Sequence, residues 1–173
     1  MSKFLIGQGF DIHRLQSKEE YCQDCNQHRD LYIGGVVIEH APYVALGHSD
    51  GDCLLHAIID ALLGAFALGD IGDMFSDQDN AYKDISSVFL LKEVLDKISS
   101  LNSQYQIVNI DSTIILESPK LADYKKMIAN NIAKILNINN KQVNVKAKTN
   151  EKLDAIGDNR AISAQAVVLL EKI

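Results

Sequence analysis

The apolar and polar positions of the chain alternate in some segments and recur at helical spacing in others, which predicts a domain containing both strands and helices. Alternation predicts strands over residues 4–12, 106–116, 143–148 and 161–170. Apolar residues three and four apart predict helices over about 49–68, 86–99 and 121–136. Short apolar runs on both sides of Gly34-Gly35 predict a β-hairpin, because glycine readily adopts positive φ. We expect the first strand to end in a turn at His13-Arg14, and we expect surface loops over residues 16–30 and 70–83.

The order of these elements predicts an α+β fold: a mixed β-sheet with helices packed on one face. The helix over 49–68 is apolar nearly all round, which is typical of a helix buried on several sides. The opposite face of the sheet is too apolar to face water alone, so we expect self-association. With 173 residues and no linker or repeat, residues 1–173 are predicted to form a single domain.

Composition and charge exclude several classes of protein. The net charge of -6 and the pI near 5.3 offer no basic surface, so nucleic acid is not an expected partner. No apolar run approaches the ~18 residues of a membrane span, and no targeting segment is recognisable. Three cysteines are too few for a disulfide framework, so we expect a cytoplasmic protein.

Three side chains near the start of the chain form a candidate metal site. Asp11 and His13 are two apart on a predicted strand and therefore point to the same face, and His56 lies near the start of the following helix. Two nitrogens and one oxygen from protein leave a coordination position open, which is typical of a catalytic metal ion. The alternative is three unrelated polar residues.

Other polar motifs each allow two interpretations. His48-Ser49-Asp50 is either a simple helix cap, with Ser49 or Asp50 as N-cap, or a phosphate site at a helix start. Leu68-Gly69-Asp70-Ile71-Gly72 is either a helix stop, with Gly69 ending the helix, or a loop that presents Asp70 to a ligand hydroxyl.

Two further sets of residues carry possible metal or phosphate chemistry. Cys22, Cys25 and His28 have the spacing of a metal finger but lack a fourth ligand, so exposed thiols in a loop are favoured. Lys146, Lys148 and Lys152 surround Thr149-Asn150-Glu151, which is either a solvated strand end or a phosphate cradle with a carboxylate for a hard cation.

Many of these motifs occur together and in a fixed order along nearly the whole chain. They are Gly9-Phe10-Asp11-Ile12-His13, Ile33-Gly34-Gly35-Val36, His48-Ser49-Asp50-Gly51-Asp52, His56-Ala57, Asp60-Ala61-Leu62-Leu63-Gly64-Ala65, Leu68-Gly69-Asp70-Ile71-Gly72, Pro119-Lys120, Val143-Asn144-Val145-Lys146-Ala147 and Glu151-Lys152-Leu153. In this arrangement the chain resembles the 2-C-methyl-D-erythritol 2,4-cyclodiphosphate synthase family. The resemblance favours the metal-site interpretation of Asp11, His13 and His56.

The resemblance implies a homotrimer around a sheet-lined central axis, with active sites between adjacent subunits. The implied substrate is 4-diphosphocytidyl-2-C-methyl-D-erythritol 2-phosphate, a small nucleotide-linked molecule of the non-mevalonate isoprenoid pathway. Its 2-phosphate attacks the β-phosphorus of its own diphosphate, closing a ring and releasing CMP. No covalent enzyme intermediate is needed, so positioning and charge neutralisation are expected to supply most of the acceleration.

The resemblance also implies roles for individual residues. Zn²⁺ is expected at Asp11, His13 and His56, and a second ion, Mg²⁺ or Mn²⁺, is expected at Glu151, where it bridges the substrate diphosphate. His48 and Thr149 are the implied catalytic residues. Ser49 is expected at the erythritol phosphate, Asp70 and Gly72 at the sugar, and residues 116–122 at the cytosine. The full set of implied substrate-binding residues is Asp11, His13, His48, Ser49, Asp70, Gly72, Phe75, Asp79, Leu116, Ser118, Pro119, Lys120, Leu121, Ala122, Lys148, Thr149, Asn150 and Glu151.

The chain departs from the usual family pattern at several positions. Ser76 replaces the proline expected after Phe75, and Lys148 and Asn150 stand where Thr is frequent. Ala155 and Asp158, followed by Arg160, occupy the places where an aromatic residue and an Arg commonly line the trimer axis. The resemblance therefore does not extend to an anion or isoprenoid-diphosphate site on that axis. The segment between His13 and Leu31 is longer than usual and is assigned no function.

Two other functions fit the same three ligands. A non-haem iron oxygenase also uses two histidines and a carboxylate, but it leaves residues 148–151 unexplained. A trimeric scaffold with a structural metal would bind the ion without releasing CMP.

Overall fold

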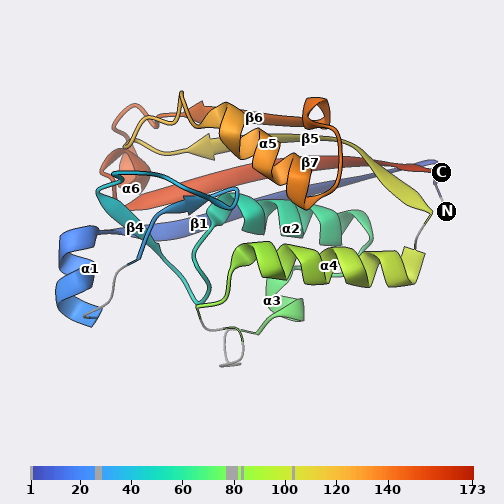
Figure 1. The fold of residues 1–173 in the computed structure, drawn as a ribbon, viewed down its shortest axis with the longest axis horizontal. Coiled ribbons are helices and arrows are strands. Elements are labelled where there is room, and N and C mark those ends of the chain that lie inside the picture. The colour runs from blue at the N-terminus through green and yellow to red at the C-terminus, as the bar shows by residue number, and fades with distance from the viewer. Residues whose placement is uncertain (1, 26–28, 77–81, 83, 103) are drawn as a thin grey trace.

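A computed structural model describes residues 2–25, 29–76, 82, 84–102 and 104–173. Its centre is a five-stranded sheet in the order β4-β1-β7-β5-β6 (Figure 1). The strands are β1 (Phe4–Ser17), β4 (Tyr43–Leu46), β5 (Tyr105–Ile115), β6 (Val143–Lys148) and β7 (Ala161–Lys172). The pair β5 and β6 is parallel and the other neighbours are antiparallel, so the predicted mixed sheet is confirmed.

The helices lie beside the sheet, which gives the chain an α+β architecture. They are α1 (Lys18–Cys25), α2 (Cys53–Ala65), α3 (Ile71–Met74), α4 (Ser87–Asn102), α5 (Lys125–Ile135), the 3-10 helix η2 (Asn140–Gln142) and α6 (Asp154–Gly157). Helix α2 packs on β1 and β7, α5 packs on β6, and α4 packs against α2. The two chain ends lie at one end of the sheet, and α1 and α6 lie at the other (Figure 1). None of the helices within the described ranges has the length and apolar character needed to span a membrane.

Helix α2 lies directly on the backbone of β1, and two glycines make this possible. A Cβ atom on Gly7 would lie 1.8 Å from the carbonyl oxygen of Ala61, and one on Gly9 would lie 2.0 Å from that of Ala57. Eleven residues of α2 are buried, because the sheet covers one side of the helix and α4 another. The helix that is apolar nearly all round is therefore buried on several sides, as predicted.

The hairpin of β2 (Tyr32–Ile33) and β3 (Val36–Val37) is anchored to the start of α2. Gly34 and Gly35 both have positive φ, at 62° and 72°, as the hairpin prediction required. The carboxylate of Asp52 is fully buried and accepts hydrogen bonds from the N–H groups of Gly34 at 2.9 Å, Gly35 at 2.6 Å and Leu55 at 3.0 Å. One carboxylate thus caps α2 and fixes the turn of the hairpin.

Two predictions for the first third of the chain were wrong. The strand does not end at His13-Arg14 but continues to Ser17, because residues Arg14 to Ser17 pair with β4, a four-residue strand too short to show a period. Residues 16–30 are not simply a loop, because they contain α1. That helix begins after Ser17, whose hydroxyl accepts a hydrogen bond from the Glu20 N–H at 3.2 Å, and it has no apolar stripe that would reveal it.

The limits predicted for the helix over 49–68, which is α2 in the structure, were also wrong. Its N-cap is Asp52 rather than Ser49 or Asp50. The helix stops before Leu68 because Ala67 adopts positive φ and the Leu68 N–H bonds back to the Leu63 carbonyl, so Gly69 is not the stop. The predicted loop over 70–83 contains α3, whose N-cap is Asp70.

The sheet face opposite the helices carries exposed apolar side chains from β1. Ile6 is 69% exposed, Phe10 48% and Ile12 50%. In the neighbouring strand, Val167 lies beside Gln8 on the same face. These neighbouring side chains form an exposed apolar row on this face, as the prediction of an apolar open face required.

We predict that Gly9→Ala will lower the free energy of unfolding by about 1–3 kcal/mol or more, because the new methyl group forces α2 away from β1. It should also weaken zinc binding, because His56 is carried by α2 and Asp11 by β1. Gly64→Ala is the matched control: the nearest atom to its Cβ is 3.9 Å away, so it should stabilise α2 by up to about 1 kcal/mol. Urea unfolding and zinc titration of both variants would test this, and equal stability of the two would contradict it.

Candidate metal centre and ligand pocket

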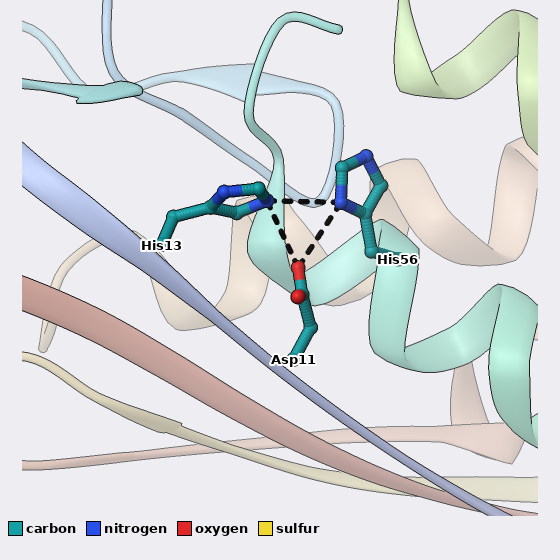
Figure 2. Close-up of side chains that lie close together, drawn as sticks. All are labelled: Asp11, His13 and His56. Atoms are coloured by element: carbon teal, nitrogen blue, oxygen red, sulfur yellow. Dashed lines mark hydrogen bonds and ion pairs between the residues drawn. The ribbon is translucent and has the colours of Figure 1, made fainter. Parts of the chain in front are cut away.

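Asp11, His13 and His56 converge on one point, as the sequence predicts (Figure 2). The Oδ2 atom of Asp11 lies 3.0 Å from Nε2 of His13 and 3.0 Å from Nδ1 of His56. The same two nitrogens lie 3.0 Å from each other. Strand β1 supplies two of the side chains and the first turn of α2 the third, so the close packing of this helix on this strand creates the cluster.

The three atoms have the spacing of metal ligands. Three donor atoms that lie 3.0 Å from one another are close enough to bind a single ion together, each at ~2.0 Å. Three protein ligands are one fewer than a tetrahedral zinc ion takes, so such an ion could accept a further ligand. The donor set of two imidazoles and one carboxylate suits a borderline ion such as zinc.

His13 is oriented for this role by a backbone carbonyl. Its Nδ1 lies 2.9 Å from the carbonyl oxygen of Leu46 in β4, and a carbonyl oxygen can only accept a hydrogen bond. Nδ1 of the neutral ring therefore carries the proton and Nε2 carries the lone pair that faces Asp11 and His56. The missed strand β4 thus contributes to the site through its backbone.

The charges in the cluster favour ionised Asp11. Burial raises the pKa of Asp11, but the hydrogen bonds and positive charge that His13 and His56 supply when their facing nitrogens carry a proton outweigh burial and hold the pKa well below its ordinary range. Burial lowers the pKa of His13, but the hydrogen bond and charge of Asp11 raise it above its ordinary value. Protons therefore compete with a metal ion at His13.

Cys53 lies beside the cluster without joining it. Its thiol donates to the carbonyl oxygen of Asp11 at 3.1 Å, and the side chain is buried. Burial, followed by the charges of Asp11 and Asp52, raises the pKa of this thiol well above its ordinary value. It remains a protonated, packed side chain.

The three candidate ligands open into a pocket of about 350 Å³. The predicted residues His48, Ser49, Gly72 and Phe75 line it together with Asp11, His13 and His56, and further lining residues are Gly47, Ile71, Tyr82 and Leu90. Phe75 packs edge-to-face on Tyr82, with ring centroids 5.2 Å apart. The pocket therefore combines a metal-binding end with an apolar wall.

A second group of predicted residues lines a separate, smaller hollow. Lys120, Leu121, Ala122, Lys148 and Thr149 surround about 140 Å³ beside the start of α5. Neither this hollow nor the metal pocket is lined by residues of the other group. Within one chain, the predicted residues that line either cavity thus fall into two separate groups, which we call half-sites.

The loop after β6 is held by Glu117, which lies within the predicted stretch 116–122 but was not selected as a binding residue. Its Oε2 accepts hydrogen bonds from the N–H groups of Asn150 at 3.1 Å and Lys152 at 3.4 Å. Thr149 donates its hydroxyl to Glu151 at 3.1 Å, so these two predicted residues lie together. Glu151 is exposed and has positive φ, which presents its carboxylate outward from a tight turn.

Comparison with known proteins shows the family of this chain. A family model, the YgbB family, matches residues 4–171. The 2-C-methyl-D-erythritol 2,4-cyclodiphosphate synthase of Fusobacterium nucleatum is 49% identical over 167 residues, covering 96% of both chains. The protein of that name from Clostridium novyi is 50% identical over 169 residues, covering 96% of this chain and 98% of its own length.

This chain belongs to the YgbB family. A solved structure described as IspF of Plasmodium falciparum in a CDP complex is similar over 99% of this chain and 98% of its own, with a TM-score of 0.81 and 35% identity. The resemblance inferred from the ordered motifs is confirmed.

Some positions expected from the YgbB family resemblance lie outside the pocket. Asp70 is exposed and uses its carboxylate to cap α3 through the Asp73 N–H at 3.0 Å, so in this chain it does not line the metal pocket. Lys146 pairs with Asp111 at 2.6 Å on the open sheet face, which argues against its place in a phosphate cradle. Asp79, His28 and the side chain of Cys25 lie outside the described residues.

Sequence reasoning missed two residues whose hydrogen bonds hold parts of the pocket in place. Ser87, the first residue of α4, lies 2.9 Å from Nε2 of His56. Asp60 accepts the Ile71 N–H at 2.8 Å and so fixes the start of α3 beside Gly72. Ser87 has no sequence signal, because thirty-one positions separate it from His56. Asp60 had one: it lies four residues after His56, on the same face of α2.

We predict that zinc affinity rises with pH through the raised pKa of His13 and falls by up to about tenfold per pH unit below it, because the ion needs the neutral ring. Competition with a chelator between about pH 6 and pH 9 would measure this. His40→Asn, which alters an exposed histidine that is not among the three ligands, should leave the profile unchanged. A flat profile in the unmodified protein would contradict the assignment.

Proposed function

We propose that this protein is a 2-C-methyl-D-erythritol 2,4-cyclodiphosphate synthase, a phosphorus–oxygen lyase that converts 4-diphosphocytidyl-2-C-methyl-D-erythritol 2-phosphate into the cyclic diphosphate and CMP. Curated relatives at 49–50% identity over nearly the whole chain carry this name. The observation that carries the proposal is the cluster of Asp11, His13 and His56, whose open side faces a pocket of about 350 Å³.

The bond changes of this reaction set what the site must do. An oxygen of the 2-phosphate attacks the β-phosphorus, and the bond from the β-phosphorus to the CMP oxygen breaks. A zinc ion at Asp11, His13 and His56, with Mg²⁺ or Mn²⁺ at Glu151, would polarise the diphosphate and offset its negative charge. The protein must fold a polyanion back on itself and exclude water while the ring closes.

The described side chains can bind the parts of the substrate and stabilise its negative charge. His48 and Ser49 line the same pocket as the metal ligands and can contact a phosphate that binds there. Gly72 and Phe75 also line this pocket, and their small and apolar surfaces suit the methyl-erythritol part. Thr149 and Lys148 line the second hollow, where they can meet the diphosphate of a nucleotide whose base lies against residues 116–122.

The two half-sites support a homotrimer with shared active sites. The metal pocket and the hollow of Lys120 and Thr149 are separate within a chain, yet one substrate must contact both. A neighbouring copy that supplies the second hollow would complete the first. The exposed apolar row of Ile6, Phe10 and Ile12 is a surface that other copies would bury in such an assembly.

One assay tests the activity directly. Purified protein incubated with the cytidylyl substrate, zinc and magnesium should release CMP and the cyclic diphosphate in equal amounts, which mass spectrometry would detect. His56→Ala should remain folded, lose zinc and lose nearly all turnover, because one of three ligands is gone. Full activity in that zinc-free variant would sink the proposal, and oxygen consumption in place of CMP release would favour the iron oxygenase.

We predict that two inactive variants will restore activity when they share a trimer. His56→Ala removes the metal half-site and Glu151→Ala the other half-site. Random mixing of the two chains at equal amounts should recover about one quarter of wild-type activity, since three quarters of the trimers are mixed and each holds one intact site of three. Co-expression with two affinity tags would produce these trimers. No recovery would place each active site within one chain.

A further inference from the structure

Nε2 of His56, the ring nitrogen that faces away from the metal cluster, lies among buried hydroxyl groups. It lies 2.9 Å from Oγ of Ser87 and 3.0 Å from Oγ of Ser49. Ser87 is 0% exposed and Ser49 is 6% exposed, so water has little access to this nitrogen. The protonation of Nε2 is therefore set by the protein.

Ser87 is in turn held by Asp50. The Ser87 N–H donates to Oδ2 of Asp50 at 3.0 Å, and the Ser87 hydroxyl donates to Oδ1 of the same carboxylate in a short hydrogen bond. An ionised carboxylate only accepts hydrogen bonds, so the hydroxyl proton of Ser87 is committed to Asp50. The Ser87 oxygen can then offer His56 only a lone pair.

This polarity decides which tautomer of His56 is stable. Ser49 accepts the Gly51 N–H at 3.2 Å, and its own proton can go to the Ser87 oxygen, 3.5 Å away. Both serine oxygens then accept at Nε2, which requires a proton on Nε2 and leaves the lone pair of the neutral ring on Nδ1. Nδ1 is the atom that faces Asp11 and His13, 3.0 Å from each. We propose that Asp50 and Ser87 are positioning residues that hold His56 in its Nε2–H tautomer and so prepare Nδ1 to bind the metal ion.

The acceptor must be strong because Asp11 acts in the opposite direction. Its carboxylate lies 3.0 Å from Nδ1 and, without a metal ion, favours a proton there. A serine backed by a carboxylate is a better acceptor than a lone hydroxyl, since the first hydrogen bond polarises the second. Asp50 thus opposes Asp11 through Ser87, on the other side of the same ring.

The fold explains why the hydrogen-bonded chain from Asp50 through Ser87 to His56 can form. Asp50 donates its N–H to the Ile85 carbonyl at 3.0 Å, and the Asp84 N–H donates to the His48 carbonyl at 2.7 Å. These bonds join the segment before α2 to the segment before α4, which brings Ser87 against His56. A purely structural role of Asp50, as an anchor for the start of α4, is therefore the alternative that an experiment must exclude.

Two variants separate these roles. Ser87→Ala removes the hydroxyl but keeps the backbone N–H that anchors α4 to Asp50. Asp50→Asn keeps the size of the side chain; its amide oxygen can still face the Ser87 N–H, so its NH₂ group faces the Ser87 hydroxyl and turns that proton toward Nε2. Both changes should weaken zinc binding, by about tenfold for Ser87→Ala, where Ser49 remains, and by up to about a hundredfold for Asp50→Asn.

The matched controls are neighbours that do not contact His56. Ser86→Ala removes an exposed hydroxyl that accepts the Val88 N–H, and Asp84→Asn removes an exposed charge from the same segment. Zinc dissociation constants from chelator competition should stay at the wild-type value in both controls. The melting temperature of metal-free Ser87→Ala should match that of Ser86→Ala.

NMR of the zinc-loaded protein provides a readout that a structural anchor would not change. We expect a downfield Nε2–H signal of His56, protected from solvent exchange, which shifts and exchanges faster in Ser87→Ala. Wild-type zinc affinity in Ser87→Ala and in folded Asp50→Asn, or no protected Nε2–H in the wild type, would overturn the inference. The inference rests on the proposed metal site, but the experiments distinguish the two. If the wild-type protein does not bind zinc at all, the metal site itself is wrong.

Discussion

The close approach of α2 to β1 is the constraint on which the rest of the structure depends. The carbonyl oxygens of Ala57 and Ala61 occupy the space where side chains of Gly9 and Gly7 would lie. At this separation an imidazole from the helix reaches an imidazole and a carboxylate from the strand, each 3.0 Å away. The site is therefore a property of backbone packing: the ligands would be present but too far apart if the helix stood off by the width of a methyl group.

The sequence predicted those features that depend on local patterns. Alternating apolar residues located β5, β6 and β7, and the paired glycines located the hairpin, because each signal is contained within a few residues. The spacing of Asp11 and His13 predicted their common direction for the same reason. His56 was grouped with them because it lies near the start of the following helix, and the order of motifs then favoured a metal site over three unrelated residues.

The features that were missed depend on partners distant in the chain. Strand β4 exists because the second half of β1 needs a neighbour, and four residues cannot show a period. Ser87 and the Leu46 carbonyl act on the ligands only because the fold brings them there. Helix α1 is different: Ser17 and Glu20 gave a capping signal, but the absence of an apolar stripe concealed it.

The buried thiol of Cys53 bears on which metals the centre would select. A thiolate next to two imidazoles would attract soft ions such as copper(I) or cadmium, which compete strongly with zinc. The hydrogen bond from Sγ to the Asp11 carbonyl and the raised pKa of the thiol keep this sulfur out of the ligand set. The protein thereby places a cysteine beside the candidate ligands while the donor set remains two nitrogens and one oxygen, a set less suited to thiophilic ions than one that includes a thiolate.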